Sequence, residues 1–225
     1  MNKTREYSIK SNISSRFLDA AVEFTNRAIL YEKENTTDGA EYYHYIFSSI
    51  ILCVSFLEAN INELYSRIED KNIKVKNEEI VTSLWSRGIP RTARYPIIEK
   101  YEILLDIIGD SKLDKSKILY QNIIALIRLR NALVHFEPEW TTINNRDRKE
   151  NSLEKTLKNK YLLNPFMNEK TQAFFPDVCL SAGCSYWAIQ NTAQFILEYY
   201  KFLNIEITSK KIYANIFDKI SKLPV

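Results

Sequence analysis

The sequence predicts an all-helical protein that forms one domain. Only 4 glycines and 6 prolines interrupt its 225 residues, so it offers few of the tight turns that an all-β sandwich requires. Its long runs carry apolar residues every three or four positions, which is the spacing of one face of an α-helix. We expect a single helical bundle over residues 1–225, with its core at about 40–140 and 176–203 and additional helices towards the C-terminus.

The composition is that of a folded, soluble protein, because 45% of the residues are hydrophobic and 26% are charged. The net charge of +3 permits a phosphate-bearing partner without requiring one. The N-terminus lacks the apolar run of a signal peptide. The longest apolar stretch, Tyr45 to Leu57, is interrupted by serines and is too short to span a bilayer. We therefore expect a cytoplasmic protein that does not contact a membrane.

The cysteines are three in number, at Cys53, Cys179 and Cys184, and all fall in apolar segments. An odd number of cysteines implies no disulfide framework, and a reduced intracellular protein is the simplest interpretation. No histidine or further cysteine accompanies Cys179 and Cys184 at metal-binding spacing, so core thiols are expected and no cofactor.

The first two helices are expected at about 12–34 and 40–70, separated by the polar run 35–39. Both keep one apolar face at helical spacing, and the second keeps it throughout its length. Polar residues also follow the second helix beside its apolar face, at Ser48, Ser55, Glu58 and Asn62. A charged turn leads to a short helix near 78–86. Another helix should begin at Pro96, because proline fits the first helical turn, and should run to about residue 108.

The segment from Ile118 to Trp140 is the most informative part of the chain. Asp114 is expected to cap its helix, and Pro138 should end that helix after His135. The predicted apolar stripe consists of Leu119, Ile123, Ile127, Arg130 and Val134. A second stripe lies about 140° round the same helix and consists of Gln121, Ile124, Arg128, Asn131 and His135.

Arg130 is anomalous because it occupies a stripe position where a leucine or isoleucine would be expected. A buried guanidinium without a partner is very costly, so it must meet a carboxylate, a phosphate or a carbonyl. Glu58 is the natural candidate for this partner. The alternative is that Glu58 simply lies at the solvent edge of its helix.

The stretch 141–160 is polar and charged, and it has two interpretations. It is either a solvated loop that carries a short helix or an arm that contacts phosphates. The arm would use Arg146, Arg148, Lys149, Lys155, Lys158 and Lys160. Beyond it, a long helix is expected from about Pro176 to Leu203, and a last helix at about 208–222.

The run Arg130-Asn131-Ala132-Leu133-Val134-His135 resembles the signature of the HEPN superfamily, a group of helical domains that includes many RNases. The longer string from Leu129 to Trp140 is similar to that of uncharacterised bacterial HEPN-like proteins, and SFLEANINEL at 55–64 resembles their preceding helix. The resemblance covers residues 40–140 and, weakly, the helix of Trp187. It implies a HEPN-like helical bundle and a homodimer whose interface forms a composite cleft.

A metal-independent endoribonuclease is the first functional hypothesis. An imidazole such as that of His135 can take a proton from an RNA 2′-hydroxyl or give one to the leaving 5′-oxygen. A guanidinium such as that of Arg130 can stabilise the charge that the phosphorane gains. Cleavage would leave a 2′,3′-cyclic phosphate, and DNA would be inert. On one unbroken helix the two side chains diverge, so either the helix loosens near His135 or two copies pool their residues.

Further residues are expected to support this chemistry. Asn131, Glu58 and Asn62 would orient the phosphate or hold the arginine in place. Additional RNA contacts would come from Arg128, Arg146, Arg148 and Lys149. The resemblance also implies a setting in phage defence or toxin–antitoxin growth arrest, with an antitoxin or a nucleotidyltransferase as a partner.

Two other interpretations remain open. The protein is a non-catalytic HEPN-like module that binds nucleotide, RNA or protein, in which Arg130 holds a phosphate and His135 is structural. Alternatively, both residues only fix packing, with Arg130 paired to Glu58 and His135 bonded to a carbonyl. The other histidine, His44, lies among tyrosines and is expected at the surface.

Overall fold

A computed structural model of the chain describes residues 10–34, 37, 39–91, 94–109, 112–138, 152–207 and 211–224. Every regular element in these ranges is helical, and no β-strand forms within them, which confirms the predicted all-α fold. The elements are α1 (Ser14–Glu34), α2 (Ala40–Glu69), α3 (Glu78–Ser86), α4 (Ile97–Ile108), α5 (Ile118–Val134), α6 (Ser152–Leu157), the π-helical turn η1 (Phe174–Val178), α7 (Ala182–Phe202) and α8 (Lys211–Ser221).

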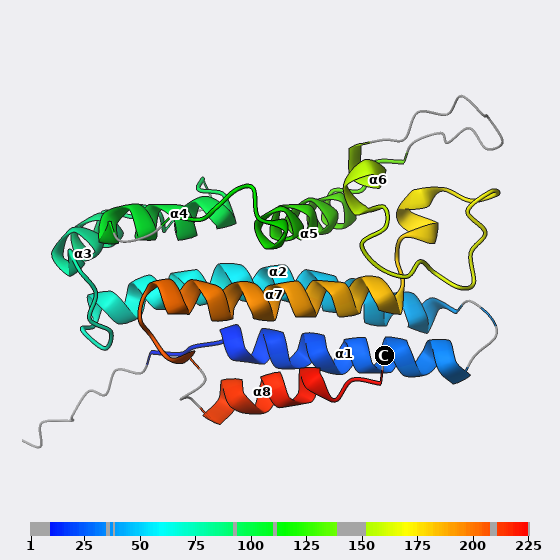
Figure 1. The fold of residues 1–225 in the computed structure, drawn as a ribbon, viewed down its shortest axis with the longest axis horizontal. Helices are drawn as coiled ribbons and strands as arrows, with labels where there is room; N and C mark the ends of the chain where they lie inside the picture. Colours follow the sequence, from blue (N-terminus) through cyan, green and yellow to red (C-terminus); the bar gives the residue numbers. More distant parts are fainter. Residues whose placement is uncertain are drawn as a thin grey trace, which may run out of the picture.

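The long helices α1, α2 and α7 lie side by side and form the centre of the molecule (Figure 1). The last helix, α8, packs on α1 at one edge. On the opposite side α4 and α5 lie end to end, and both contact α2 (Figure 1). The short α6 packs on α5 and η1 contacts α6, so the C-terminal end of α5 meets an irregular part of the chain.

The central helix is α2, whose length and apolar composition would allow it to cross a membrane. Half of its most apolar 18-residue window is buried inside the fold. Buried side chains recur along the whole helix, from Tyr42 to Ile68, because α1, α5 and α7 pack around it. Burial in the protein core therefore accounts for its apolar character.

The start of α1 is fixed by a carboxylate of α2. The backbone N–H groups of Ile13 and Ser14 both donate to Glu63 Oε1, at 2.7 Å each. The Ser14 hydroxyl donates to Glu63 Oε2 at 2.6 Å. A carboxylate at this end satisfies N–H groups that have no partner within the helix and complements the helix dipole. Glu63 thus sets how α1 lies along α2.

The long helix α7 begins at Ala182 rather than at Pro176, so its predicted start was wrong. Phe174–Val178 forms the separate turn η1, and Ser181 then caps α7 by accepting a hydrogen bond from the Cys184 N–H at 2.9 Å. The Ser181 hydroxyl itself donates to the carbonyl of Leu162 at 2.6 Å. The serine hydroxyl accepts a hydrogen bond from a backbone N–H of the first turn that has no partner within the helix, which is why the helix starts here.

Candidate functional site

The helix α5 carries the candidate site at its C-terminal end. It begins after Lys117, and the predicted cap Asp114 instead accepts a hydrogen bond from the Ser116 N–H at 2.9 Å. It ends at Val134, close to the predicted end. His135 leaves the helical conformation, with φ −112° and ψ 44°, while its N–H donates to Asn131 O at 2.9 Å.

The buried face of α5 differs from the predicted apolar stripe. Its members are Asn122, Ile123, Ala125, Leu126 and Leu129. Val134, predicted to be buried, is 51% exposed. The reason is that both α2 and α7 pack against α5, and their positions rather than the periodicity alone decide which side faces the core. Arg130 therefore lies at the border of the buried face and is half-buried.

One N–H group of the Arg130 guanidinium forms no hydrogen bond. Its Nε atom is buried and has no hydrogen-bond partner. No carboxylate in the described part of the chain forms an ion pair with it. A buried donor without an acceptor costs about 1–3 kcal/mol, so native proteins rarely leave one unpaired without a reason. Arg130 thus keeps the property that singled it out in the sequence.

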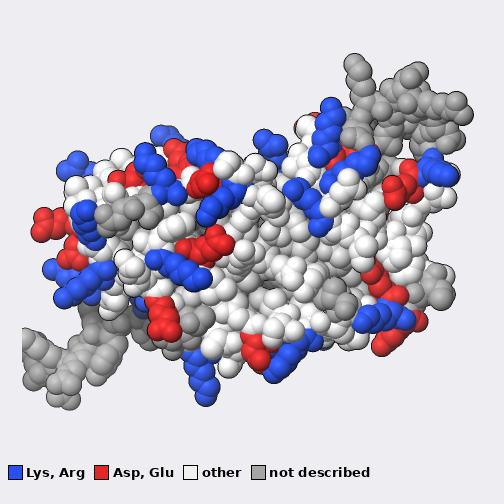
Figure 2. Space-filling view, in the orientation of Figure 1, with Lys and Arg blue, Asp and Glu red and all other residues white. Residues whose placement is uncertain are grey.

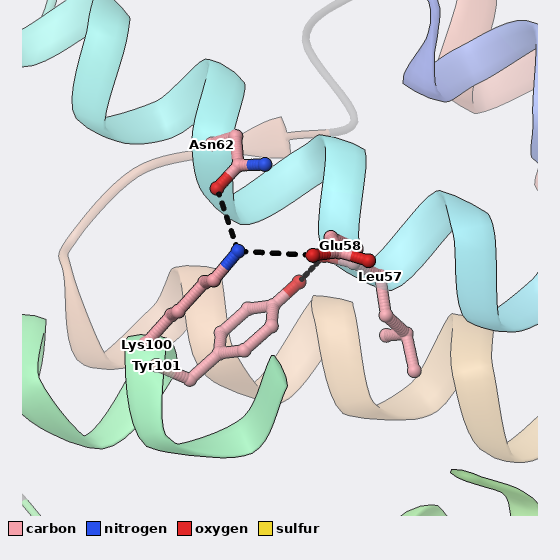
Figure 3. Close-up of polar contacts among 5 residues, drawn as sticks. All are labelled: Leu57, Glu58, Asn62, Lys100 and Tyr101. Atoms are coloured by element: carbon pink, nitrogen blue, oxygen red, sulfur yellow. Dashed lines mark hydrogen bonds and ion pairs between the residues drawn. The ribbon is translucent and has the colours of Figure 1, made fainter. Parts of the chain in front are cut away.

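The expected pair between Glu58 and Arg130 does not form. Glu58 Oε1 instead accepts a hydrogen bond and ion pair from Lys100 Nζ of α4 at 3.0 Å (Figure 3). Lys100 Nζ also donates to Asn62 Oδ1 at 3.3 Å. Two of the residues predicted to support phosphate binding therefore hold a lysine of their own chain, and Lys100 is 1% exposed.

Two tyrosines beside this pair join α2 to α4. The Tyr101 hydroxyl donates to Leu57 O at 2.7 Å (Figure 3), and the Tyr65 hydroxyl donates to Lys100 O at 3.0 Å. Lys100 was not predicted from the sequence as a residue of this cluster. Its signal was the same as that of Arg130, a cation at an apolar position of a helix, because Ile97 and Leu104 share its face.

The second predicted stripe of α5 is largely exposed. Arg128, Asn131 and His135 all reach solvent, so each is accessible to a ligand. On a continuous helix, positions 130 and 135 would point about 140° apart, but His135 has left the helical conformation. Arg130 is half-buried and His135 is exposed, so the two side chains differ in their access to solvent.

The basic segment is only partly described. Arg146, Arg148 and Lys149 lie outside the described residues. Lys155 and Lys158 are exposed on or just after α6, while Lys160 Nζ donates to Asn122 Oδ1 of α5 at 2.6 Å. Figure 2 shows several Lys and Arg side chains over α5 and α6. Basic side chains therefore lie near the end of α5, with acidic side chains among them (Figure 2).

The three thiols are buried and free. Burial raises the pKa of both Cys53 and Cys184 to about 12, and it raises the pKa of Cys179 as well. Such thiols stay protonated at neutral pH and are poor nucleophiles. Among the described residues no group of three or more His, Cys, Asp or Glu side chains is placed to hold a metal ion.

Comparisons with models of known protein families, with curated protein sequences and with solved structures found no match to this chain. The resemblance to HEPN proteins therefore rests on the sequence motifs alone, and a function must be argued from the residues at the end of α5.

Proposed function

We propose that the protein is a metal-independent endoribonuclease of HEPN type that acts as a homodimer. The observation that carries the proposal is the buried Nε of Arg130, which lacks an acceptor and lies five residues before an exposed histidine. A half-buried guanidinium at a helix end, with no ion pair to a described carboxylate, is suited to a phosphate, because phosphate oxygens accept from its terminal N–H groups and balance its charge.

The chemistry requires only these two side chains and the RNA. His135 takes the proton from a 2′-hydroxyl, whose oxygen then attacks the neighbouring phosphorus. The bond from phosphorus to the 5′-oxygen breaks, and a protonated imidazole supplies a proton to that oxygen. Arg130 stabilises the negative charge of the phosphorane. The products are a 2′,3′-cyclic phosphate and a free 5′-hydroxyl.

A second copy of the chain brings the two groups together. Positions 130 and 135 lie about 140° apart round a continuous helix, so in this proposal the arginine of one copy serves with the histidine of its partner. Apolar residues remain exposed where α5 ends, since Val134 is 51% and Phe136 is 50% exposed. An isologous contact between two α5 helices would cover such residues, and contacts of this symmetry are the commonest in dimers. The proposed biological setting, phage defence or growth arrest in the cytoplasm, follows from the resemblance.

A non-catalytic RNA- or nucleotide-binding module is the second candidate. The observation that favours it is the different exposure of the two residues, since Arg130 is half-buried whereas His135 is exposed. In this alternative Arg130 binds a phosphate, and the exposed imidazole takes no part in chemistry. Binding of RNA without cleavage would identify this function.

The test is cleavage of RNA in the presence of EDTA. We expect the wild-type protein to produce cyclic-phosphate ends, detected by mass spectrometry, and to leave DNA of the same sequence intact. Arg130→Ala and His135→Ala should each abolish cleavage while helicity, measured by circular dichroism, is unchanged. The matched controls are Arg16→Ala and His44→Ala, which remove exposed residues of the same types from α1 and α2.

A mixing experiment tests the composite site. When the Arg130→Ala and His135→Ala proteins are refolded together, half of the dimers contain one chain of each kind. Each such dimer holds one intact pair, so about a quarter of the wild-type activity should return. Equal cleavage by a protein carrying both substitutions, or no cleavage by the wild type, overturns the nuclease proposal.

A further inference from the structure

A polar pocket of about 300 Å³ lies at the end of the bundle where α2 leads into α3, remote from the C-terminal end of α5 (Figure 1). It is bounded by the stretch before α1, the C-terminal part of α2, helix α3 and the loop after α3. Every side chain in its wall carries a polar group, and the wall includes Lys10, Asn62, Glu63, Ser66, Trp85 and Arg91. The pocket therefore suits a charged or strongly polar ligand.

Arg91 gives this pocket an accessible cation. Its side chain is exposed, and it forms no ion pair with a carboxylate in the part of the chain that the structure describes. The guanidinium carbon lies 5.4 Å from the centroid of the Trp85 ring. That ring is buried and stacks on Tyr65, with centroids 5.0 Å apart and an angle of 10° between the planes. Contact with this rigid aromatic pair restricts where the guanidinium lies and leaves its charge free to bind an anion.

Asn62 gives the same pocket a hydrogen-bond donor. Its Oδ1 accepts from the buried Lys100 Nζ at 3.3 Å, and its amide nitrogen is turned away from that lysine (Figure 3). The nitrogen forms no hydrogen bond within the described residues, so it is available to a ligand. An ammonium group at the oxygen also polarises the amide and makes its N–H groups stronger donors. Ser66, one turn later on the same face of α2, adds a hydroxyl group to the wall.

The other charged residues of the wall already have partners. The Glu63 carboxylate accepts hydrogen bonds from the backbone N–H and the hydroxyl of Ser14, at 2.7 and 2.6 Å. Its negative charge is thus directed at the first turn of α1. Lys10 Nζ forms an ion pair with Asp70 at 2.6 Å. Among the described residues of the wall, Arg91 is therefore the cation left without a counter-charge, and the pocket can balance one anionic group.

We propose that this pocket binds the phosphate group of a small molecule. The Arg91 guanidinium binds phosphate oxygens, and the Asn62 amide and the Ser66 hydroxyl donate to the same group. These donors come from α2 and from the loop after α3, and a tetrahedral phosphate accepts hydrogen bonds from more directions than a planar carboxylate. One free cation suits a single phosphate group, whereas an RNA strand is bound by several cations along its backbone. The site is separate from the end of α5 and does not depend on the proposed nuclease activity.

Calorimetric titration of the full chain with inorganic phosphate tests the site. We expect saturable binding with a Kd of about 1 mM or lower, and much weaker binding of acetate at the same ionic strength. Arg91→Met should raise the Kd for phosphate about tenfold or more, because it removes the cation that balances the phosphate. The matched control is Arg87→Met, which removes the exposed arginine directly after α3, outside the pocket. It should leave the Kd unchanged, and equal Kd values for the two variants overturn the proposal.

The substitution Asn62→Asp keeps the test independent of folding. Aspartate has nearly the same shape and retains the oxygen that Lys100 uses, so urea unfolding should show no loss of stability. The change replaces the amide donor at the pocket with a negatively charged oxygen, which repels phosphate. Phosphate binding should therefore be abolished in a protein that is still folded. A folded Asn62→Asp protein that binds phosphate as the wild type does would show that the amide does not meet the ligand, and the site would be wrong.

A competition experiment distinguishes a small phosphate compound from RNA as the source of the phosphate. A 2′-O-methyl RNA ten-mer, which lacks the 2′-hydroxyl needed for cleavage, should leave the Kd for inorganic phosphate unchanged. Displacement of phosphate by the ten-mer would make the pocket part of an RNA-binding surface and overturn the small-molecule ligand. The phosphate titration contains no RNA, so its result stands whether or not the protein cleaves RNA.

Discussion

Lys100 of α4 donates to the Glu58 carboxylate of α2 at 3.0 Å, and the two partners differ sharply in exposure. The lysine side chain is 1% exposed, whereas the glutamate side chain is 39% exposed. Glu58 can therefore be hydrated if its partner is lost, but Lys100 cannot. The ion pair thus joins α4 to α2 through a buried ammonium group and a partly solvated carboxylate.

This asymmetry predicts that Glu58→Ala destabilises the protein more than Lys100→Met. Removing the carboxylate leaves a buried ammonium with only Asn62, at a cost of about 1–3 kcal/mol in the free energy of unfolding. Replacing the lysine by methionine fills the same volume and costs about 1 kcal/mol or less. Urea unfolding of the two variants gives both values. A larger loss for Lys100→Met would show that the pair depends on the lysine charge instead.

A side chain introduced at Gly183, in the first turn of α7, is predicted to clash with the backbone. A Cβ atom at this position would lie 2.5 Å from the carbonyl oxygen of Leu162. Alanine normally stabilises a helix relative to glycine by up to about 1 kcal/mol. We expect Gly183→Ala instead to lower the free energy of unfolding by about 1–3 kcal/mol, because the backbone of Leu162 must move.

Gly39→Ala is the matched control for that substitution. Its new Cβ would meet only the end of the Tyr31 side chain and no backbone atom within 4 Å. We expect a smaller loss in the free energy of unfolding than for Gly183→Ala, because the Tyr31 ring can tilt more readily than the backbone of Leu162 can move. Equal losses for the two alanine variants in urea unfolding would contradict the predicted clash at Leu162.

The buried thiols predict a loss of stability at alkaline pH. Burial raises the pKa of Cys53 and of Cys184 to about 12 in the folded protein, whereas an exposed thiol has a pKa of about 8.5. Above that lower value the unfolded state loses protons that the folded state keeps, so the unfolded state is favoured. The stabilisation is complete below pH 8.5 and declines as pH rises towards 12.

Urea unfolding under reducing conditions at pH 8, 9 and 10 measures this decline. The interval from pH 8 to 9 isolates the thiols, because tyrosines in the unfolded chain have a pKa of about 10. At pH 10 the buried tyrosines, whose pKa is also raised by burial, add to the decline. A protein with both Cys53→Ala and Cys184→Ala should show a flatter profile from pH 8 to 10, even if it is less stable at every pH. A profile as steep as that of the wild type would mean that other groups are responsible.

Local sequence patterns predicted where the helices lie along the chain, but they did not predict which helices and side chains contact one another. The spacing of apolar residues placed α2 and α3 almost at their observed bounds, because a helix needs only its own residues to form one apolar face. The pairing of Glu58 with Lys100 depends on how α4 lies along α2, and periodicity carries no information on that arrangement. For the same reason the buried face of α5 was misplaced, since it is set jointly by α2 and α7.

The start of α7 shows a further limit of sequence analysis. Phe174–Val178 continues the apolar pattern of α7, so periodicity extended the helix back to Pro176. Ser181 could be seen in the sequence as a possible helix cap. It sets the start of α7 only because its hydroxyl also donates a hydrogen bond to the Leu162 carbonyl, a contact that the sequence does not reveal. In contrast, Arg130 could be singled out from the sequence, because a cation beside a hydrophobic stripe needs no knowledge of the fold to be noticed. The structure places it half-buried, at the border of the buried face of α5.

We predict that Arg130 is needed for RNA binding and cleavage but not for the stability of the fold. Its buried Nε has no acceptor, so this donor adds nothing to the stability of the folded protein. Replacing it with methionine keeps much of the apolar stem and removes the unsatisfied donor, and substitutions of this kind are often neutral or stabilising. We expect Arg130→Met to change the free energy of unfolding by less than about 1 kcal/mol, or to raise it, while RNA binding and cleavage are lost.

Leu129→Ala, one position earlier, is the control that shows the assay can detect a loss of packing at this helix. Leu129 is fully buried, and its truncation should lower the free energy of unfolding by about 2–5 kcal/mol. A comparable loss for Arg130→Met would mean that the arginine stabilises the fold and that its position does not reflect a phosphate. A stable Arg130→Met protein that has lost RNA binding would instead tie the guanidinium to the ligand, because the arginine would then be needed for binding and not for the fold.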